Sequence, residues 1–420
     1  MQTNLADFIK DTIEGKEADT ILRTCVHCGF CLAICPTYQL LDDELDSPRG
    51  RIYLMKQVLE GQIATQKTQL HLDRCLTCRA CETVCPSGVR YGRLVDICRN
   101  VVEKQVGRSL RANTIRYALR QVLPNPSIFA SLLKMGQIVR SLLPKRIRDS
   151  VPSKARDAGA WPSAQHTRKM LVLDGCVQPA IAPNINAAAA RILDKLGISL
   201  IKAENAGCCG AVSYHLNAQQ EGLDYMRHNI DAWWPYIESS VGQGIEAIVM
   251  TASGCGVTVK EYGHFLSHDR IYAAKAARIS ELTKDISEIL EVETKNLTPL
   301  LNNSRPSTGK SKLSFHSPCT LQHGLQIHGV IENILTTAGF DLSFVRDSDL
   351  CCGSAGTYSI LQPQLSKQLL KNKIVELESS SPTQIVTANI GCLTHLQSGT
   401  ALTVKHWVEV LDEKLLGHYI

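Results

Sequence analysis

Residues 25–36 read Cys-Val-His-Cys-Gly-Phe-Cys-Leu-Ala-Ile-Cys-Pro, and residues 75–86 repeat the pattern as Cys-Leu-Thr-Cys-Arg-Ala-Cys-Glu-Thr-Val-Cys-Pro. In each stretch three cysteines lie three residues apart, a fourth follows after four residues, and a proline comes directly after it. This spacing allows one short turn to present three thiolates to a single centre, while the fourth cysteine faces away. Because the same specific spacing occurs twice, the two stretches are expected to act as one module.

The spacing is typical of ligands to a [4Fe–4S] cluster, and in a two-cluster module the fourth cysteine of each stretch binds the other cluster. A zinc site is disfavoured because it takes two cysteine pairs around one tetrahedral ion, and disulfides are disfavoured because nothing exports the chain. His27 is expected to be a solvated loop residue, since thiolates fill all ligand places. We therefore predict two clusters with these ligand sets: Cys25, Cys28, Cys31 and Cys85 for one, and Cys75, Cys78, Cys81 and Cys35 for the other.

Length and composition indicate a cytoplasmic protein of two or three domains. The chain has 420 residues, of which 44% are hydrophobic and 17 are cysteines. The cysteines fall in clustered, repeated patterns, which indicates metal binding rather than disulfides. The first residues lack a basic start followed by an apolar run, and no apolar run approaches the length of a membrane span. Neither a signal peptide nor a transmembrane helix is therefore predicted.

Positive charge is concentrated in one segment. Residues 99–170 hold 15 Lys or Arg against three acidic residues, whereas the rest of the chain holds 30 basic and 37 acidic residues. The pattern from 99 to 149 is helical, with a break at 124–126, and 150–167 reads as a linker. An apolar stripe in this segment is flanked by basic residues, and such a helix can lie on an anionic membrane surface or dock on an acidic partner. Packing between domains is slightly favoured over that contact, and nucleic acid is disfavoured because no aromatic residues interleave with the charges. The stripe comprises Ile128, Leu132, Leu133, Met135, Ile138, Leu142 and Leu143, and the basic residues beside it are Lys134, Arg140, Lys145, Arg146 and Arg148.

A helix is predicted between the two cysteine stretches, at 52–59. Ser47 is placed to cap it, with Pro48 in its first turn. Arg49 and Arg51 either screen the negative charge of a cluster or meet a partner, or they are simply solvated at the helix start. Cys98 lies outside every motif and is expected to be a small buried residue.

The second half of the chain contains an internal repeat. In the first copy, strands are expected at 169–175, 198–202 and 246–251, with a helix at 185–196. Cysteines follow each strand, and the middle group is the segment Gly-Cys-Cys-Gly. These cysteines are Cys176, Cys208, Cys209 and Cys255.

The second copy has the same order, with strands at 312–316, 340–345 and 384–387 and a helix at 330–338. The first cysteine precedes the Cys-Cys pair by 32 positions in both copies. The offset between copies is 143 residues at those two points and 137 at the last cysteine. The second set of cysteines is Cys319, Cys351, Cys352 and Cys392.

All eight repeat cysteines fall at strand ends or helix starts, and such positions gather at the carboxyl ends of strands in open α/β sheets. Four thiols from three loops can therefore converge in each copy. A ligand, redox or contact role is favoured over buried, unreactive cysteine, because the Cys-Cys-Gly segment recurs in register.

We predict a mixed α+β and α/β chain, with an N-terminal helical ferredoxin-type domain that holds two clusters, followed by two repeated α/β Cys-Cys-Gly domains. The expected boundaries are 1–100 for the two-cluster domain, 101–167 for a basic helical linker, 168–291 for the first repeat, 292–311 for a connecting loop and 312–420 for the second repeat.

This order of motifs resembles the iron–sulfur subunits of flavin-linked oxidases and disulfide reductases, in particular the glycolate oxidase iron–sulfur subunit. Related subunits occur in anaerobic glycerol-3-phosphate dehydrogenase, lactate-oxidising complexes and heterodisulfide reductase. The resemblance implies FAD on partner subunits, a quinone-type electron acceptor and a peripheral position on the inner face of the cell membrane. In heterodisulfide reductase the last repeat segment is a CxxC pair, whose second cysteine is replaced here by Thr258 and His395. The resemblance therefore does not imply the additional clusters of that enzyme.

The sequence contains no dinucleotide fingerprint, since 242–244 and 353–356 are too short, and no general base with a partner stands out, so no catalytic residue is assigned. Iron–sulfur chains move single electrons, so a flavin on another subunit is expected to perform the two-electron oxidation. Three hypotheses remain. The chain is the electron-transfer subunit of a glycolate (2-hydroxyacid) dehydrogenase or of a lactate or glycerol-3-phosphate dehydrogenase; it is a disulfide reductase acting at the Cys-Cys-Gly segments; or it is a scaffold with structural clusters.

Overall fold

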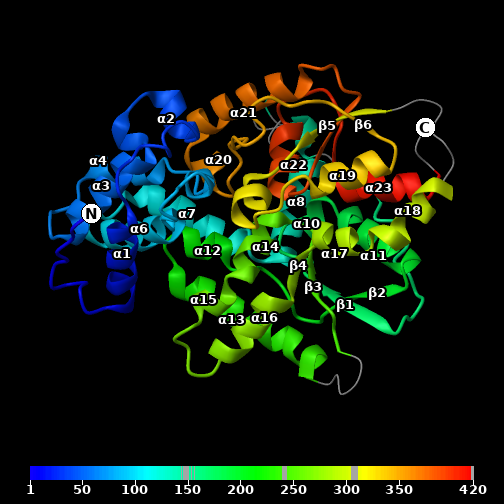
Figure 1. Ribbon diagram of the computed structural model, residues 1–420, viewed down its shortest axis with the longest axis horizontal. Coiled ribbons are helices and arrows are strands. Elements are labelled where there is room, and N and C mark those ends of the chain that lie inside the picture. Colours follow the sequence, from blue (N-terminus) through cyan, green and yellow to red (C-terminus); the bar gives the residue numbers. More distant parts are fainter. Residues whose placement is uncertain are drawn as a thin grey trace.

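The computed structural model describes residues 1–142, 144, 151–152, 154–155, 157–238, 244–303 and 311–417. A helical module at the N-terminus is followed by two α/β repeats that lie side by side, the first green and the second yellow to red in Figure 1. Among the described helices none combines the length and the apolar character needed to cross a bilayer.

The N-terminal module packs its helices around α6, whose neighbours are α1, α3 and α4. Ser47 accepts a hydrogen bond from the Gly50 amide and caps α3, with Pro48 in the first turn, as predicted. Helix α6 continues beyond residue 100 and buries Val102 in the same core, so the predicted domain boundary falls inside a helix. The elements are α1 (Ile13–Thr24), α2 (Pro36–Leu41), η1 (Glu44–Asp46), α3 (Pro48–Leu59), α4 (Gln66–Asp73), α5 (Ala80–Thr83) and α6 (Tyr91–Val106).

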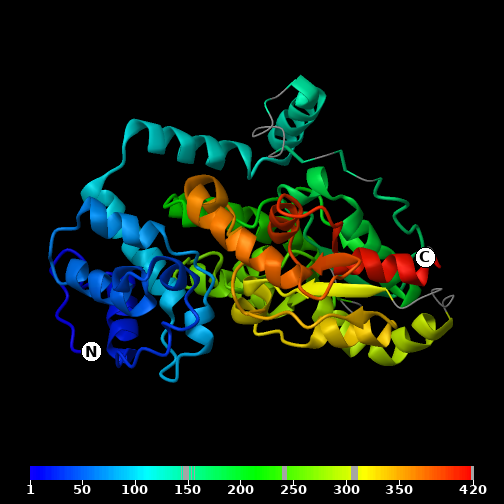
Figure 2. The ribbon, with the colours of Figure 1, turned by 90° about the horizontal axis from the view of Figure 1, so that it is seen from above.

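The basic segment forms α7 (Leu110–Val122) and α8 (Pro126–Ile138), with the predicted break between them and a 3-10 turn, η2 (Arg140–Leu142), after them. Figure 2 shows these helices as an arm along one side of the molecule. Part of the positive charge is neutralised within the fold, because Arg108 and Arg116 both pair with Asp73. The predicted basic residues Lys145, Arg146 and Arg148 lie outside the described residues, as does Leu143.

Each repeat contains a four-stranded parallel sheet, and the two sheets have the same strand order, β2-β1-β3-β4 and β6-β5-β7-β8. The six predicted strands are present, although β1, β3 and β6 are shorter than predicted. The fourth strand of each sheet was not predicted, because Thr-Lys-Asp and Val-Lys-His are too short and too polar to carry a strand pattern. The strands are β1 (Arg168–Val172), β2 (Ile198–Lys202), β3 (Ile248–Met250), β4 (Thr283–Asp285), β5 (Lys312–His316), β6 (Asp341–Leu342), β7 (Gln384–Thr387) and β8 (Val404–His406).

Helices cover both sheets. In the first repeat they are α10 (Gln178–Ile181), α11 (Asn184–Lys195), α12 (Ala211–His215), α13 (Gln219–Glu238), α14 (Ser253–Lys260), α15 (Tyr262–Phe265), α16 (Ala273–Leu282), α17 (Ile286–Val292) and α18 (Thr294–Asn303). In the second they are the π-helical turn η3 (Thr320–Gly324), α19 (Val330–Thr337), α20 (Tyr358–Leu361), α21 (Pro363–Glu378), α22 (Ile390–Gln397) and α23 (Trp407–Leu415).

The segment predicted as a connecting loop, 292–311, contains helix α18. Leu297 and Leu301 lie about one helical turn apart, and both are buried in a core that the two repeats share. Across this core α11 packs against α23 and α17 against α19. His406 on the second repeat lies with its Nε2 2.9 Å from the carbonyl oxygen of Thr251 on the first. The repeats therefore share one core at their interface, in addition to the smaller apolar cluster that each buries on its own.

Candidate metal centres

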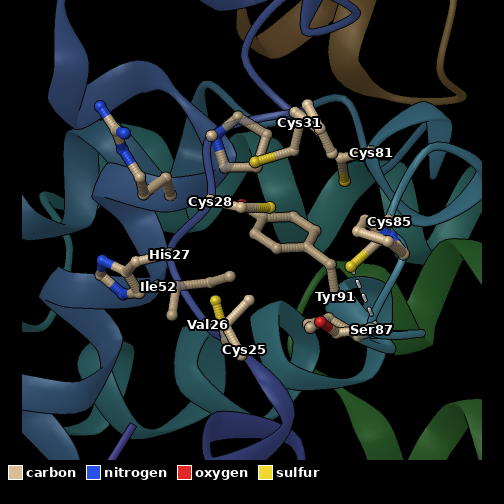
Figure 3. Close-up of a pocket in the computed structure, with 16 residues that line it drawn as sticks. Cys25, Val26, His27, Cys28, Cys31, Ile52, Cys81, Cys85, Ser87 and Tyr91 are labelled. Carbon is tan, nitrogen blue, oxygen red and sulfur yellow. Dashed lines mark hydrogen bonds between the residues drawn. The ribbon is translucent and has the colours of Figure 1, made fainter.

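The first predicted ligand set lines one cavity at the surface of the N-terminal module. Cys25, Cys28, Cys31 and Cys85 all face this cavity, which we call the outer site (Figure 3). Cys25 is buried and Cys28 is exposed. The side chains that follow Cys25 and precede Cys31 reach solvent, because Val26 and Phe30 are each 65% exposed.

The second predicted set lines a neighbouring cavity, the inner site. Its cysteines are Cys35, Cys75, Cys78 and Cys81, and Cys81 also borders the outer site. The loop that carries Cys78 is covered by the second repeat, where Leu76 and Cys78 pack against Cys319 and Tyr358. Each predicted set thus lines one cavity, and Cys81 borders both cavities.

The two cysteine loops fold alike. His27 and Gly29 adopt left-handed backbone conformations in the first loop, and Thr77 and Arg79 adopt them at the equivalent positions of the second. These turns let each loop wrap around its cavity. His27 is half-buried rather than solvated, its Nε2 has no hydrogen-bond partner among the described residues, and Figure 3 shows its ring directed away from the cysteine sulfurs.

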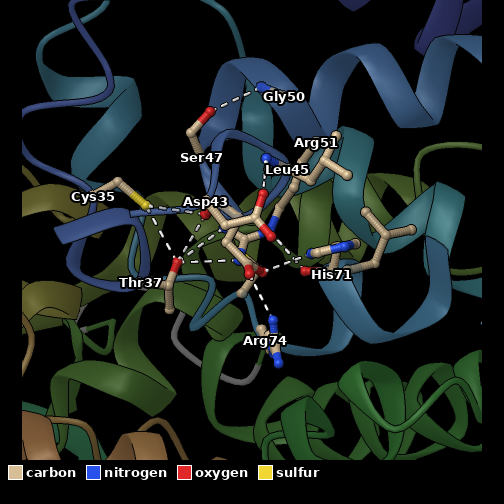
Figure 4. A network of polar contacts seen from close by, with 12 residues as sticks. Cys35, Thr37, Asp43, Leu45, Ser47, Gly50, Arg51, His71 and Arg74 are labelled. Atoms are coloured by element: carbon tan, nitrogen blue, oxygen red, sulfur yellow. Dashed lines mark hydrogen bonds and ion pairs between the residues drawn. The ribbon is translucent and has the colours of Figure 1, made fainter. Parts of the chain in front are cut away.

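A buried polar network lies behind the inner site (Figure 4). Cys35 Sγ is 3.4 Å from Thr37 Oγ1, which in turn accepts hydrogen bonds from the Arg51 guanidinium. Arg51 also pairs with Asp46 at 3.1 Å and is only 1% exposed, and Arg74 reaches the same carboxylate at 2.7 Å. Burial opposes the charge of Arg51, yet the acidic groups around it, among them Tyr91, Cys75, Cys35 and Asp46, raise its pKa.

Of the two arginines considered from sequence, therefore, only Arg51 is placed to screen negative charge from within the fold. Arg49 is partly exposed beside the outer site and pairs with Glu44 at 2.8 Å. A third arginine, which sequence reasoning missed, fixes the inner loop: Arg99 donates to the Cys75 carbonyl oxygen and to Thr77 Oγ1. Cys98 is fully buried in α6 and borders neither site.

The donor groups fit iron–sulfur clusters. Burial raises the pKa of Cys31 to about 11 and the pKa values of Cys78 and Cys81 well above the usual value for a thiol. Partly buried thiols with raised pKa values stay protonated unless a cationic centre replaces the proton, and metal binding releases those protons. The amides of Thr77 and Val89 donate to Cys75 Sγ and Cys85 Sγ, and hydrogen bonds to sulfur help to tune cluster potentials.

A larger cavity of about 320 Å³ lies between the N-terminal module and the two repeats, and residues of all three parts line it. We call it the central cavity. It lies at the carboxyl ends of the strands, where Cys176 follows β1 and Cys255 follows β3, so that the cysteines meet where the strand order reverses. Only Cys352 among the repeat cysteines does not line it. The cysteines that border it are Cys75, Cys78, Cys176, Cys208, Cys209, Cys255, Cys319, Cys351 and Cys392.

The glycine of each Cys-Cys-Gly segment is required by the backbone. Gly210 and Gly353 have φ values of +89° and +90°, and an added Cβ would lie 2.5 Å from the Gly222 carbonyl oxygen in one repeat and 2.7 Å from the Ser366 carbonyl oxygen in the other. Their amides donate to Cys208 Sγ and Cys351 Sγ, both at 3.4 Å. Helix α13 in the first repeat and helix α21 in the second thus approach the Cys-Cys-Gly segment closely and hold its thiols in place.

The pKa of Cys209 shifts in the opposite direction to the pKa values of its neighbours Cys208 and Cys255 and of Cys319 in the second repeat. In the first repeat, hydrogen bonds from Cys208 and Cys255 lower the pKa of Cys209 well below its usual value. In the second repeat, Cys319 Sγ lies 3.8 Å from Cys351 Sγ, and this contact together with burial raises the pKa of Cys319. Burial also lowers the pKa of the nearby His316 to about 3, so that its imidazole is neutral.

Pairs of residues distant in sequence hold the module on the repeats. Arg79 makes a two-pronged ion pair with Glu261 at 2.5 and 2.8 Å, and His215 Nδ1 lies 3.2 Å from Asp96 Oδ1. Thr83 contacts His323 on the second repeat. Sequence reasoning missed these pairs, because a single sequence contains no signal that links positions more than a hundred residues apart.

Comparison with known proteins agrees with this arrangement. A family model described as a 4Fe-4S dicluster domain matches residues 21–89, and one described as a cysteine-rich domain matches residues 170–260 and 313–397. The chain is 54% identical to the "Glycolate oxidase iron-sulfur subunit" of Escherichia coli over 99% of each chain. It is 30% identical to the "Probable glycolate oxidase iron-sulfur subunit" of Bacillus subtilis, over 90% of this chain and 89% of the relative.

A shorter relative, "Lactate utilization protein A" of Anoxybacillus flavithermus, is 25% identical over 57% of this chain and 97% of its own length. The near full-length similarity, the dicluster match over both cysteine stretches and the cysteine-rich match over both repeats all lead to the same assignment. The chain belongs to the family of glycolate oxidase iron–sulfur subunits.

Proposed function

We propose that this chain is the electron-transfer subunit of a flavin-dependent glycolate (2-hydroxyacid) dehydrogenase, which oxidises glycolate to glyoxylate. One observation carries the proposal: eight cysteines line two adjacent cavities, four in each predicted set, and Cys81 borders both. Adjacent redox centres of this kind suit a path for electrons. The printed names of two relatives, each matched over at least 89% of its length, support glycolate as the substrate of the complex.

The outer site would hold one [4Fe–4S] cluster through Cys25, Cys28, Cys31 and Cys85, and the inner site a second through Cys75, Cys78, Cys81 and Cys35. Bound clusters would supply one-electron oxidation and reduction. The residues of this chain set the conditions for that chemistry. Arg51 places a fixed positive charge behind Cys35, and the second repeat packs against the loop that carries Cys78.

Glycolate gives up two electrons and two protons on its conversion to glyoxylate, and FAD on a partner subunit would supply this two-electron chemistry. The two cysteine sites of this chain would then carry the electrons singly toward a quinone-type acceptor, whose reduction takes two electrons from the chain and two protons from water. The outer site is the proposed point of entry, because Cys28 is exposed and is flanked by the solvent-facing Val26 and Phe30.

The arm formed by α7 and α8 is the proposed contact with an anionic membrane surface on the cytoplasmic face. Leu132, Met135 and Ile138 are exposed along α8, and Lys134 lies among them. A helix that exposes apolar and basic side chains together favours the interface of an anionic bilayer. This position would bring the chain close to a quinone dissolved in the membrane.

Rapid anaerobic mixing of the oxidised chain with its FAD-binding partner and glycolate tests the role. We expect the visible absorbance of the clusters to bleach when glycolate and the partner are both present, and to return when a quinone analogue is added. Glycolate with the chain alone should cause no bleaching. Cys98→Ala is a matched control, since it removes a buried cysteine outside both sites. Full bleaching by glycolate without the partner, or none with it, would overturn the proposal.

A further inference from the structure

The second repeat places three buried potential metal ligands together. A ring nitrogen of His316 and the sulfurs of Cys352 and Cys392 all lie within 4.8 Å of one another. They come from three successive positions at one edge of the sheet: His316 ends β5, Cys352 belongs to the Cys-Cys-Gly segment after β6, and Cys392 lies in the first turn of α22 after β7. This placement is independent of the eight cysteines assigned to the outer and inner sites.

The two ring nitrogens of His316 differ in their contacts. Nδ1 lies 2.9 Å from Thr387 Oγ1, whereas Nε2 is buried and has no hydrogen-bond partner among the described residues. Buried polar groups are nearly always satisfied, so an orphaned imidazole nitrogen beside two thiols calls for a partner. When Nδ1–H donates to the Thr387 hydroxyl, Nε2 keeps its lone pair, which is the usual arrangement of a metal-binding histidine.

The first repeat provides an internal comparison. At the offset of 143 residues Leu173 occupies the position of His316, and at the offset of 137 Met250 occupies that of Thr387. Both are buried in the apolar core of the first repeat. Cys209 and Cys255 keep the two thiol positions, so the nitrogen donor and its hydroxyl support occur together in one repeat only.

The surroundings of the three ligands suit two thiolates and a divalent ion. The Asn389 side-chain amide donates to Cys392 Sγ at 3.5 Å, which stabilises a thiolate there. One imidazole and two thiolates form a donor set for a borderline cation such as Zn²⁺ or Fe²⁺. Zn²⁺ binds sulfur at about 2.3 Å and nitrogen at about 2.0–2.1 Å, so shifts of under about 1 Å would bring the three atoms into place.

We propose that the second repeat binds one divalent cation, Zn²⁺ or Fe²⁺, through His316 Nε2, Cys352 Sγ and Cys392 Sγ. Three protein ligands leave one position of a tetrahedral ion free. Cys392 lines the central cavity, which gives this position access to a water molecule or a small ligand. The first repeat does not form this site, because Leu173 supplies no donor. The inference does not depend on the electron-transfer role.

The test compares the full chain with His316→Leu and with the control His395→Gln, which changes a half-buried histidine of the same repeat whose Nε2 already contacts Ser366. Mass spectrometry of the anaerobically purified proteins counts zinc and iron. We expect His316→Leu to lose one ion per chain, and His395→Gln to keep it. A loss of zinc identifies zinc as the resident ion, and a loss of one iron identifies iron.

Zinc titration and X-ray absorption at the zinc edge provide readouts apart from activity. The zinc-loaded wild-type chain should show one or more nitrogen ligands together with two sulfurs, and Thr387→Val should weaken zinc binding by about 10–100-fold, because it removes the group that orients His316. Zinc should raise the thermal midpoint of the wild-type chain and leave that of His316→Leu unchanged. An unchanged metal content and zinc affinity in a folded His316→Leu, or a zinc shell made of sulfur alone, would overturn the proposal.

Discussion

The outer and inner sites have the same cysteine spacing and the same left-handed turns, yet their equivalent side chains face opposite environments. Val26 is 65% exposed, whereas Leu76, at the same position of the second stretch, is 7% exposed. Phe30 likewise faces solvent, and its counterpart Ala80 is buried. The repeats cover one cysteine loop and leave the other open.

This difference indicates that the shared spacing sets how the thiols of each loop are arranged, whereas the neighbouring side chains set what each site can contact. An exposed apolar rim at the outer site suits docking of a partner subunit. A covered loop beside the central cavity suits transfer within the chain. The two sites are therefore proposed to receive electrons and to pass them on, respectively.

The largest expected effect comes from removing one ligand at each site. The intact chain should carry about eight iron atoms, and Cys31→Ser and Cys78→Ser should each lose about four. Cys78→Ser should also lower the thermal midpoint further, because its loop packs against Cys319 and Tyr358. Iron analysis and thermal unfolding, with Cys98→Ala as control, check both points. Equal loss of stability in the two variants would contradict the claim that the second repeat covers only the inner loop. Zinc without iron in the intact chain would overturn the proposed clusters.

The two arginines between the cysteine stretches give the next effect. Arg51→Met should cost about 3–5 kcal/mol of unfolding free energy, because it leaves the buried Asp46 with fewer partners. Arg49→Met removes a partly exposed ion pair with Glu44 and should cost less than about 1 kcal/mol. Urea unfolding of both variants measures the difference. Similar costs would mean that the charge behind the inner site has no special structural role.

The ion pair that holds the inner loop on the first repeat should matter less. Glu261→Gln weakens the two-pronged contact with Arg79 and should cost about 1–3 kcal/mol, since a partly buried guanidinium loses its charged partner. Glu281→Gln is the control, because its pair with Arg278 is exposed. Hydrogen exchange should quicken at residues 75–81 in Glu261→Gln alone. Faster exchange at residues 25–31 instead would contradict the proposed cover.

Substitutions at the counterparts Phe30 and Ala80 test the difference in exposure between the two loops, with smaller expected effects. Ala80→Phe should overpack the inner loop and cost about 1–3 kcal/mol. Phe30→Ala should leave stability within about 0.5 kcal/mol and weaken binding of the flavoprotein partner by about tenfold. Calorimetric unfolding and titration of the partner separate the two outcomes. Unchanged affinity of Phe30→Ala for the flavoprotein partner would show that the partner docks on another surface.

The smallest effect is expected at the arm. Lys134→Gln with Arg140→Gln should reduce sedimentation of the chain with anionic vesicles by a few fold at low salt, with no change in cluster absorbance. Charge attraction between exposed groups is screened within about 10 Å at 0.1 M salt, so the difference from wild type should shrink as salt rises. Salt-independent binding would favour packing of the arm on a protein partner.

The pairing of the two cysteine stretches in one module, the internal repeat and six strands could be predicted from the sequence, because cysteine spacing and apolar runs are local signals. Sequence reasoning missed β4 and β8, since each of these strands has only three residues, most of them polar, and so carries no pattern. It also left Arg51 undecided and treated His27 as solvated, because burial of a loop residue depends on distant segments. The partners Arg79 and Glu261 lie 182 positions apart and could not be paired from one sequence.

His316 shows both what the sequence reveals and what only the fold reveals. The offset of 143 residues places it opposite Leu173, a local difference that can be read by aligning the two copies. Its proximity to Cys352 and Cys392 is clear only in the fold, where three strand ends meet. Residues that line a candidate site were therefore predictable where cysteine spacing identifies them, and unpredictable where they come together only through the topology of the sheet.

Glycolate-driven respiration tests the central claim most directly. A strain that lacks this chain is complemented with wild type, Cys28→Ser, Cys78→Ser or Cys98→Ala, and oxygen uptake is measured after glycolate is added. The account predicts full uptake with wild type and Cys98→Ala, and near-complete loss with Cys28→Ser and with Cys78→Ser while all four chains accumulate equally. Full respiration supported by Cys28→Ser or by Cys78→Ser would show that electrons do not pass through that site.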